Sequence, residues 1–198
     1  MPGRDLELIL THEHTDFDAL ASLLGAALLF PSALPVLPRQ MNRNVREFVT
    51  LYRGHLPFIP IEDLPKGRVA RVILVDTRAM NVPRGLRDNA EVTIIDHHAT
   101  QGDERRAGRG QRAIPSHWQV WSEPVGANTT MLVEKISEQQ LPLSPVYATL
   151  LALGIHEDTG SLTYGGSTHR DARALAWLLE PERNVNMDVL NQFLHHPL

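Results

Sequence analysis

The sequence predicts an α/β fold, with a doubly wound, mainly parallel sheet of about five strands and helices on both faces. Two observations support this fold class. Apolar stretches of strand length alternate with stretches of helical periodicity in the first half of the chain, and helices follow. The strand-like stretches are continuously apolar, as at residues 72–75, rather than alternating. Such strands are typical of a sheet that is covered on both faces.

The strand-like stretches lie at residues 6–10, 33–37, 58–61, 71–75, 92–95 and 118–121. Pro35 and Pro60 cannot donate to a strand ladder, so their stretches should lie at an edge or a bulge of the sheet. Helical periodicity marks residues 20–28, 44–53, 128–136, 145–153, 172–179 and 188–194. Ser144 before Pro145 is a typical helix start, and Asn128 is a second expected N-cap.

Composition limits the possible functions. The 198 residues suit one domain, and 42% hydrophobic residues can fill its core. The net charge of −4 provides no global basic field for nucleic acid or membranes. Neither a signal peptide nor a bilayer-spanning run is visible, so we expect a cytoplasmic protein. Because the chain has no cysteine, histidines and carboxylates are the only strong metal ligands.

Polar clusters follow several of the predicted apolar elements. His12, Asp16 and Asp18 follow the first strand, and Asp76 follows the strand at 71–75. The triplet at residues 96–98, Asp-His-His, follows the strand at 92–95. Right-handed crossovers bring the carboxyl ends of parallel strands to one edge of the sheet, so these three clusters should meet.

The chemistry of these side chains indicates metal binding. Carboxylate and imidazole ligands without thiolate suit manganese, magnesium, iron or zinc, and a carboxylate-rich set favours manganese. Several aspartates around one point repel one another unless cations neutralise them. More than one ion therefore fits the cluster better than a single ion.

The motifs together resemble those of the DHH phosphoesterase family. They are His12-x-x-x-Asp16-x-Asp18, Asp76-Thr77, Asp96-His97-His98 and Asp158-Thr159-Gly160. The resemblance covers about residues 6–165. The family includes RecJ-type exonucleases, hydrolases of oligoribonucleotides and cyclic dinucleotides, and family II inorganic pyrophosphatases.

The resemblance implies two divalent ions, with manganese expected first and magnesium second. His12 and Asp16 are expected to hold one ion, Asp18 and His97 the other, and Asp76 and Asp158 to be shared by both. His98 is expected to face the scissile phosphate or its leaving group as a catalytic residue. Asp96 is expected to orient an imidazole rather than to bind metal.

The resemblance also leaves a gap. Family members carry a second, C-terminal substrate-binding domain with a glycine-rich histidine motif, and no such motif is present here. Residues 1–198 are therefore expected to be a single DHH-type domain from a longer protein with further domains. Residues 154–164 and the His12-Glu13-His14 variant are similar to DHH modules fused to CBS domains and a tRNA nucleotidyltransferase or poly(A) polymerase region.

Three functions follow from the resemblance. The first is a metal-dependent phosphodiesterase or exonuclease that hydrolyses nucleic acid or small nucleotides and is weakly active as an isolated domain. The second is a regulatory or substrate-binding module of a larger nucleotidyltransferase. The third is an inorganic pyrophosphatase, although no Ser-Arg-Lys type cluster is visible.

Several residues have a second interpretation. Asp16 and Asp18 are also suitable helix caps. The amides at residues 128–130 could bind a phosphate or form an ordinary helix start. His14 and His156 are more typical of surface or supporting histidines than of ligands. The arginines of the Gly- and Arg-rich segment 101–116 are either solvated or in contact with phosphate.

Overall fold

The computed structural model describes residues 5–98 and 116–194. Its strands are β1 (Leu6–Leu10), β2 (Leu34–Leu37), β3 (Ile59–Pro60), β4 (Val69–Val75), β5 (Leu86–Ile95) and β6 (Gln119–Trp121). Its α-helices are α1 (Phe17–Leu29), α2 (Arg43–Leu51), α3 (Asn128–Glu138), α4 (Pro145–Thr159), α5 (His169–Leu178) and α6 (Met187–Leu194). Short 3₁₀ turns lie at η1 (Ile61–Asp63) and η3 (Pro181–Arg183).

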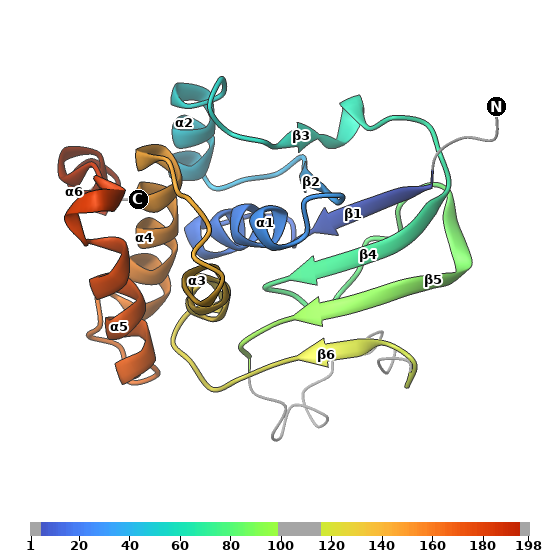
Figure 1. Ribbon diagram of the computed structural model, residues 1–198. Helices are drawn as coiled ribbons and strands as arrows, with labels where there is room; N and C mark the ends of the chain where they lie inside the picture. The colour runs from blue at the N-terminus through green and yellow to red at the C-terminus, as the bar shows by residue number, and fades with distance from the viewer. Residues whose placement is uncertain (1–4, 99–115, 195–198) are drawn as a thin grey trace.

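The strands form one sheet in the order β3-β2-β1-β4-β5-β6, and every pairing is parallel (Figure 1). The predicted α/β class and parallel sheet are confirmed, with six strands in place of about five. The edge position expected from Pro60 is confirmed, because β3 is the outer strand. The edge position expected from Pro35 is wrong, since β2 lies between β1 and β3. The pairing of β2 with β3 begins at Val36, one residue beyond this proline.

The two faces of the sheet are covered differently. Ile73 and Ile95 belong to the larger apolar cluster, to which all six α-helices of the described residues contribute. Leu74 and Ile94 point to the opposite face and join a smaller cluster of strand residues and connecting segments. The helices expected on both faces therefore cover only one face within the described residues. The described β4–β5 connection contains no helix, which leaves this second face to connecting segments.

Close approach of α1, α3 and α4 positions the polar edge of the sheet. A Cβ at Gly154 of α4 would lie 2.6 Å from the Cβ of Ala21 and 3.0 Å from the carbonyl oxygen of Phe17. A Cβ at Gly25 of α1 would lie 2.9 Å from the Cβ of Leu132 in α3. Because both glycines lack that atom, the ends of the three helices meet at the carboxyl ends of β1, β4 and β5 (Figure 1).

Three helix predictions need correction in detail. Helix α4 continues to Thr159, so the polar segment around Asp158 forms its last turns rather than a separate stretch. The N-cap of α3 is Ala127, and Asn128 is the first helical residue. In α5 the predicted face is displaced, since Ala172 is exposed. The carboxylate of Asp171 is buried as part of a capping box, and the buried face of α5 therefore consists of Asp171, Ala174, Leu175 and Leu178.

The Ser144–Pro145 start of α4 is confirmed, because the Ser144 side chain accepts a hydrogen bond from the Tyr147 amide. The predicted loop at 101–115 and the histidines at 195–196 lie outside the described residues. Among the residues that are described, no helix is both long enough and apolar enough to span a bilayer.

Candidate metal centre

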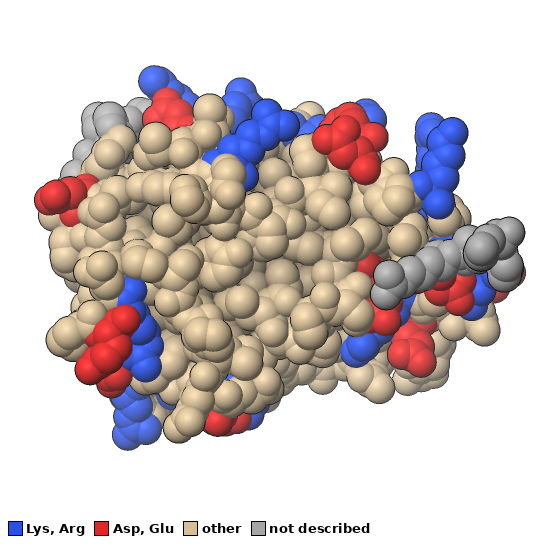
Figure 2. All heavy atoms as spheres, turned by 45° about the horizontal axis from the view of Figure 1, so that its top comes forward, with Lys and Arg blue, Asp and Glu red and all other residues tan. Residues whose placement is uncertain are grey.

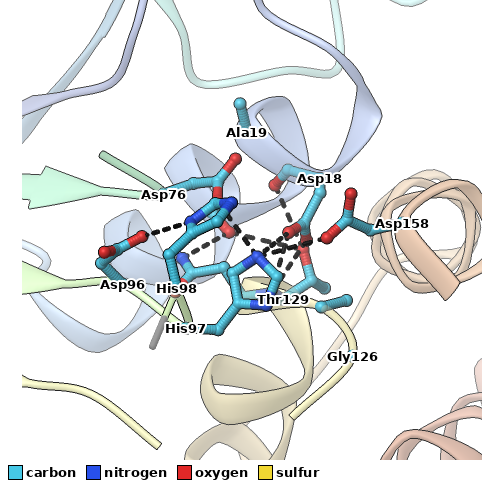
Figure 3. Close-up of polar contacts among 12 residues, drawn as sticks. Asp18, Ala19, Asp76, Asp96, His97, His98, Gly126, Thr129 and Asp158 are labelled. Carbon is cyan, nitrogen blue, oxygen red and sulfur yellow. Dashed lines mark hydrogen bonds and ion pairs between the residues drawn. The ribbon is translucent and has the colours of Figure 1, made fainter. Parts of the chain in front are cut away.

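The predicted ligands converge at the carboxyl edge of the sheet. Within the described residues, three sets of side chains place one donor atom each within 4.8 Å of the others. The sets are His12 with Asp16 and Asp76, Asp18 with His97 and Asp158, and Asp76 with His97 and His98. Figure 3 shows Asp18, Asp76, His97 and Asp158 pointing toward one another from α1, the end of β4, the end of β5 and α4. We call the first set the outer group and the second set the inner group.

The outer group is built on the loop between β1 and α1. Asp16 is the N-cap of α1, and its Oδ1 accepts a hydrogen bond from the Ala19 amide at 3.0 Å. The Nδ1 of His12 lies 2.7 Å from the Glu13 carbonyl oxygen, which can only accept, so Nδ1 carries the proton. In the neutral imidazole, Nε2 of His12 therefore has the free lone pair, and this atom lies 3.4 Å from Oδ2 of Asp76.

Asp76 stands in a conformation that L-residues rarely adopt. Its φ of 54° is in the left-handed region, directly after the last residue of β4. Such strain persists only where the surroundings hold it. The Asp76 amide donates to the Ile95 carbonyl of β5 at 2.9 Å, which anchors the turn. The turn directs the carboxylate toward both His12 and His97.

Asp18 and His97 of the inner group are deeply buried, whereas its third member, Asp158, is 36% exposed. The Asp18 side chain is 1% exposed, and its two oxygens accept the amides of Asn128 at 2.7 Å and Thr129 at 2.9 Å. These amides belong to the first turn of α3, where a negative charge is favoured. The interpretation of this helix start as a phosphate site is therefore wrong, because Asp18 already occupies those amides.

His97 is held in the orientation that a ligand needs. Its Nδ1 lies 3.1 Å from the Val125 carbonyl oxygen, so this nitrogen is the donor. Its Nε2 faces three carboxylates: Oδ2 of Asp158 at 3.2 Å, Oδ1 of Asp76 at 3.6 Å and Oδ2 of Asp18 at 3.9 Å. Asp158 lies in the last turn of α4. The side chain of its neighbour Glu157 accepts a hydrogen bond from the Phe17 amide of α1.

The electrostatics of both groups fit a bound cation. Oδ1 of Asp76 and Nε2 of His97 are buried and have no hydrogen-bond partner. Burial raises the pKa of Asp18 well above its usual range, and the charges of Asp76 and Asp158 raise it further. Burial also raises the pKa of Asp76. Aspartates crowded in this way, around unpaired oxygen and nitrogen atoms, have the donor chemistry that a hard or borderline divalent ion requires.

Asp76 belongs to the outer group, and its Oδ1 also lies 3.6 Å from Nε2 of His97 in the inner group, with which it shares the third donor set. Asp158, expected to be shared by two ions, belongs to the inner group alone. The difference follows from position. Asp76 ends the strand that lies between β1 and β5, whereas Asp158 approaches from α4 on the side of His97.

A hydrogen-bonded chain holds His98 beside the two groups. The Nδ1 of His98 lies 2.8 Å from Oδ1 of Asp96, whose other oxygen accepts Nε of Arg78 at 2.5 Å. The same guanidinium donates to the His98 carbonyl at 2.6 Å and to the Ser122 hydroxyl at 3.3 Å. Burial alone would raise the pKa of Asp96, but the hydrogen bonds from His98 and Arg78 outweigh it and lower that pKa.

Arg78 is the residue of this site that sequence reasoning missed. Its position two residues after Asp76 was the available signal, but an isolated arginine after a strand is common on protein surfaces. His14 and His156 enter no donor group among the described residues, and Nδ1 of His156 lies 3.1 Å from the Ser161 hydroxyl.

Comparisons with known proteins identify the family of this chain. A family model described as the DHH family, N-terminal domain, matches residues 8–155. The chain is 34% identical over 202 residues to an A-adding tRNA nucleotidyltransferase of Geobacter sulfurreducens, covering 98% of this chain and 21% of that protein. It is 36% identical over 181 residues to the enzyme of the same name from Aquifex aeolicus, covering 90% and 20%. The chain thus spans about a fifth of the length of these relatives.

Solved structures show the same fold. A putative family II inorganic pyrophosphatase of Methanococcus jannaschii matches with a TM-score of 0.67 at 20% identity, covering 96% of this chain and 60% of that one. An exopolyphosphatase-related protein from Bacteroides fragilis matches with a TM-score of 0.66 at 16% identity, covering 98% and 57%. At these identities the likeness concerns the fold alone. The family match spans more than half of the sequence, and the chain therefore belongs to the DHH family, whose N-terminal domain it contains.

Proposed function

We propose that this domain is a divalent-metal-dependent phosphoesterase that uses two ions, with manganese preferred and magnesium as the alternative. One observation carries the proposal: the outer and inner groups supply separate ligand sets, and Asp76 of the outer group also lies 3.6 Å from Nε2 of His97 in the inner group. His12 and Asp16 would hold one ion, Asp18, His97 and Asp158 the other, and Asp76 both. Two ions held in this way supply an acidified water and neutralise charge on phosphoryl oxygens.

The chain's own residues prepare the site for that chemistry. The Glu13 and Val125 carbonyls fix the protons of His12 and His97 on Nδ1, so that both Nε2 atoms can bind a cation. The α3 amides hold the Asp18 carboxylate in place. His98 is 67% exposed and faces the open side of the site, where it can donate a hydrogen bond to a phosphoryl oxygen or a leaving group.

The proposed substrate is a phosphodiester bond in nucleic acid or in a small nucleotide. Support comes from the relatives, whose names refer to tRNA, at 34% and 36% identity. Those names also favour a second candidate, in which this domain is one module of a larger A-adding nucleotidyltransferase and positions or edits its substrate. Pyrophosphate hydrolysis is a third candidate, supported only by likeness of fold. In all three cases we infer that residues 1–198 form one domain and that further domains of a longer chain complete the substrate site.

Metal binding and turnover test the proposal together. Calorimetry with Mn²⁺ should show two binding events in the 198-residue chain, and the loaded protein should hydrolyse bis(p-nitrophenyl) phosphate or an adenine dinucleotide. Asp76→Ala should lower kcat by about a thousandfold or more, because both ion sites lose a ligand. The control is Asp88→Asn, which changes an exposed carboxylate on β5. Failure to bind any divalent ion would exclude the proposed mechanism.

Substrate comparison separates the three candidates. Faster hydrolysis of dinucleotides than of pyrophosphate supports the phosphodiesterase, and the reverse supports the pyrophosphatase. If the domain binds Mn²⁺ but hydrolyses neither, the module of a larger nucleotidyltransferase becomes the better interpretation. In that case, Asp76→Ala in the longer protein should change its activity on tRNA.

A further inference from the structure

A groove lies beside the metal centre, under α2 and between the ends of β2 and β3. Its volume is about 480 Å³. Its walls are mainly apolar and include Leu37, Met41, Val49, Leu56 and Phe58. We call it the α2 groove. The size falls within the range of pockets that hold small ligands, about 300–1,000 Å³.

Backbone pairing connects the α2 groove to the outer group. Met41, which lines the groove, forms a parallel bridge with Thr15, the residue before Asp16. The Asn42 amide donates to the Thr15 carbonyl at 3.0 Å, and the His14 amide donates to the Gln40 carbonyl at 3.1 Å. The segment that forms one wall of the groove is therefore attached to the loop that carries His12 and Asp16.

The charges around the groove suit an anionic ligand with an apolar part. Arg39 and Arg53 line the groove, and Glu62 is its only carboxylate among the described lining residues. Glu62 already pairs with Nε of Arg39 at 2.9 Å, so the exposed Arg53 remains as a net positive charge in the turn that follows α2. Figure 2 turns the side that carries α2 and β3 in Figure 1 toward the viewer. This side has a broad surface without charged residues, and charged side chains border it.

We propose that the α2 groove binds the nucleoside next to the scissile phosphate, with Arg53 contacting a neighbouring phosphate. This inference rests on the proposed phosphoesterase function and specifies its substrate class. Pyrophosphate and polyphosphate have no apolar part that could occupy such walls. A nucleoside offers a flat base and a sugar, and its phosphate would reach the outer group past Met41.

Direct binding tests the proposal without depending on turnover. The probe is a fluorescent 2-aminopurine dinucleotide, titrated into the Mn²⁺-loaded 198-residue chain. Arg53→Ala should weaken binding about tenfold, which corresponds to the loss of one charged contact. The matched control is Arg43→Ala at the start of α2, because Arg43 is exposed, pairs with Glu47 and does not line the groove.

A second variant tests the apolar wall. Phe58→Ala should also weaken dinucleotide binding about tenfold or more, with thermal unfolding monitored to confirm that the variant is folded. Arg53→Ala should not change the KM for bis(p-nitrophenyl) phosphate, which has no neighbouring phosphate, and neither variant should change the affinity for Mn²⁺.

The outcomes distinguish this inference from the function on which it rests. If wild-type protein binds Mn²⁺ and hydrolyses bis(p-nitrophenyl) phosphate but Arg53→Ala and Phe58→Ala bind the dinucleotide normally, the groove inference is wrong and the phosphoesterase stands. Equal losses on both substrates, or no dinucleotide binding by the wild type, also overturn it. The groove would then be a surface for another protein segment. Absence of Mn²⁺ binding would overturn the phosphoesterase itself.

Discussion

The outer and inner groups use the same types of ligand in different environments. His12 in the outer group is 31% exposed, and Asp16 caps the helix that follows it. Asp18 in the inner group is 1% exposed and His97 is 10% exposed. The outer group is a loop attached to the start of one helix. The inner group lies between three helices and the sheet, where its charges are harder to solvate.

This difference shows that the unfavourable free energy of burying charged ligands falls mainly on the inner group. Burying a carboxylate is unfavourable unless hydrogen bonds or an opposite charge compensate for it. The α3 amides compensate for part of that cost at Asp18, while Nε2 of His97 is left without a hydrogen-bond partner. We therefore expect the inner group to gain most from a cation and the outer group to exchange its ion more easily.

The largest expected effect concerns Asp76, the residue that links the two groups. Asp76→Ala should remove both Mn²⁺ binding events, whereas Asp158→Ala should remove only the inner one, because Asp158 reaches only that group. Calorimetric stoichiometry measures the difference. Complete loss of both events in Asp158→Ala would show that this residue is shared, as its motif suggested.

The next effect concerns the support of His98 rather than either group. Arg78→Gln should lower kcat about ten- to a hundredfold by removing the guanidinium that holds Asp96 and the His98 backbone. Mn²⁺ affinity should stay the same, and Arg78→Lys should recover part of the rate. Arg84→Gln, an exposed change on the segment before β5, is the control. An equal loss of Mn²⁺ affinity in Arg78→Gln would mean that Arg78 shapes the ion sites themselves.

A pH effect should appear in both groups. Hydrogen bonding to Asp76 raises the pKa of His12 to about 9. Burial would lower the pKa of His97, but the nearby carboxylates of Asp158 and Asp18 raise it to about 10. Both imidazoles are therefore protonated at pH 7 in the metal-free protein, and each must release a proton to bind a cation.

Two measurements follow from the upward direction of these pKa shifts. Mn²⁺ affinity should rise with pH by up to about tenfold per unit for each proton released, which calorimetry in buffers of different ionisation enthalpy detects. Protonated histidines stabilise the metal-free fold fully below pH 6.5, and this contribution disappears as pH rises through 9 to 10. Mn²⁺ affinity that does not change between pH 6 and 8 would contradict the assignment.

The smallest expected effect compares stability in the two groups. Asp16→Asn should change the free energy of unfolding by less than about 0.5 kcal/mol, since asparagine caps helices as well as aspartate does. Asp18→Asn should lower it by about 1–3 kcal/mol, because asparagine has one oxygen and its NH2 group would face one of the two α3 amide donors. Urea unfolding without metal provides both values. An unchanged stability in Asp18→Asn would mean that relief of the buried charge offsets the lost hydrogen bond.

Sequence reasoning anticipated the sheet and the approach of the ligands for a physical reason. Continuous apolar runs such as residues 72–75 form buried strands, and parallel strands place their carboxyl ends at one edge. Sequence reasoning did not place β2 correctly. Pro35 lacks one backbone donor, but the sequence does not show whether that position faces a neighbouring strand. It also could not show that Asp18 would occupy the α3 amides, since 110 positions separate Asp18 from Asn128.

The sequence by itself determined that this chain has a parallel α/β fold, that it resembles the DHH family and which residue types gather at the sheet edge. These properties follow from local periodicity and from the order of short motifs. Only the tertiary structure decided that Asp76 links the two ligand groups, that Arg78 supports His98 and that a groove opens under α2. Each of these depends on distances between segments that are far apart in the chain. Such distances are set by how closely helices pack at Gly25 and Gly154 and by the strained turn at Asp76, which no local pattern encodes.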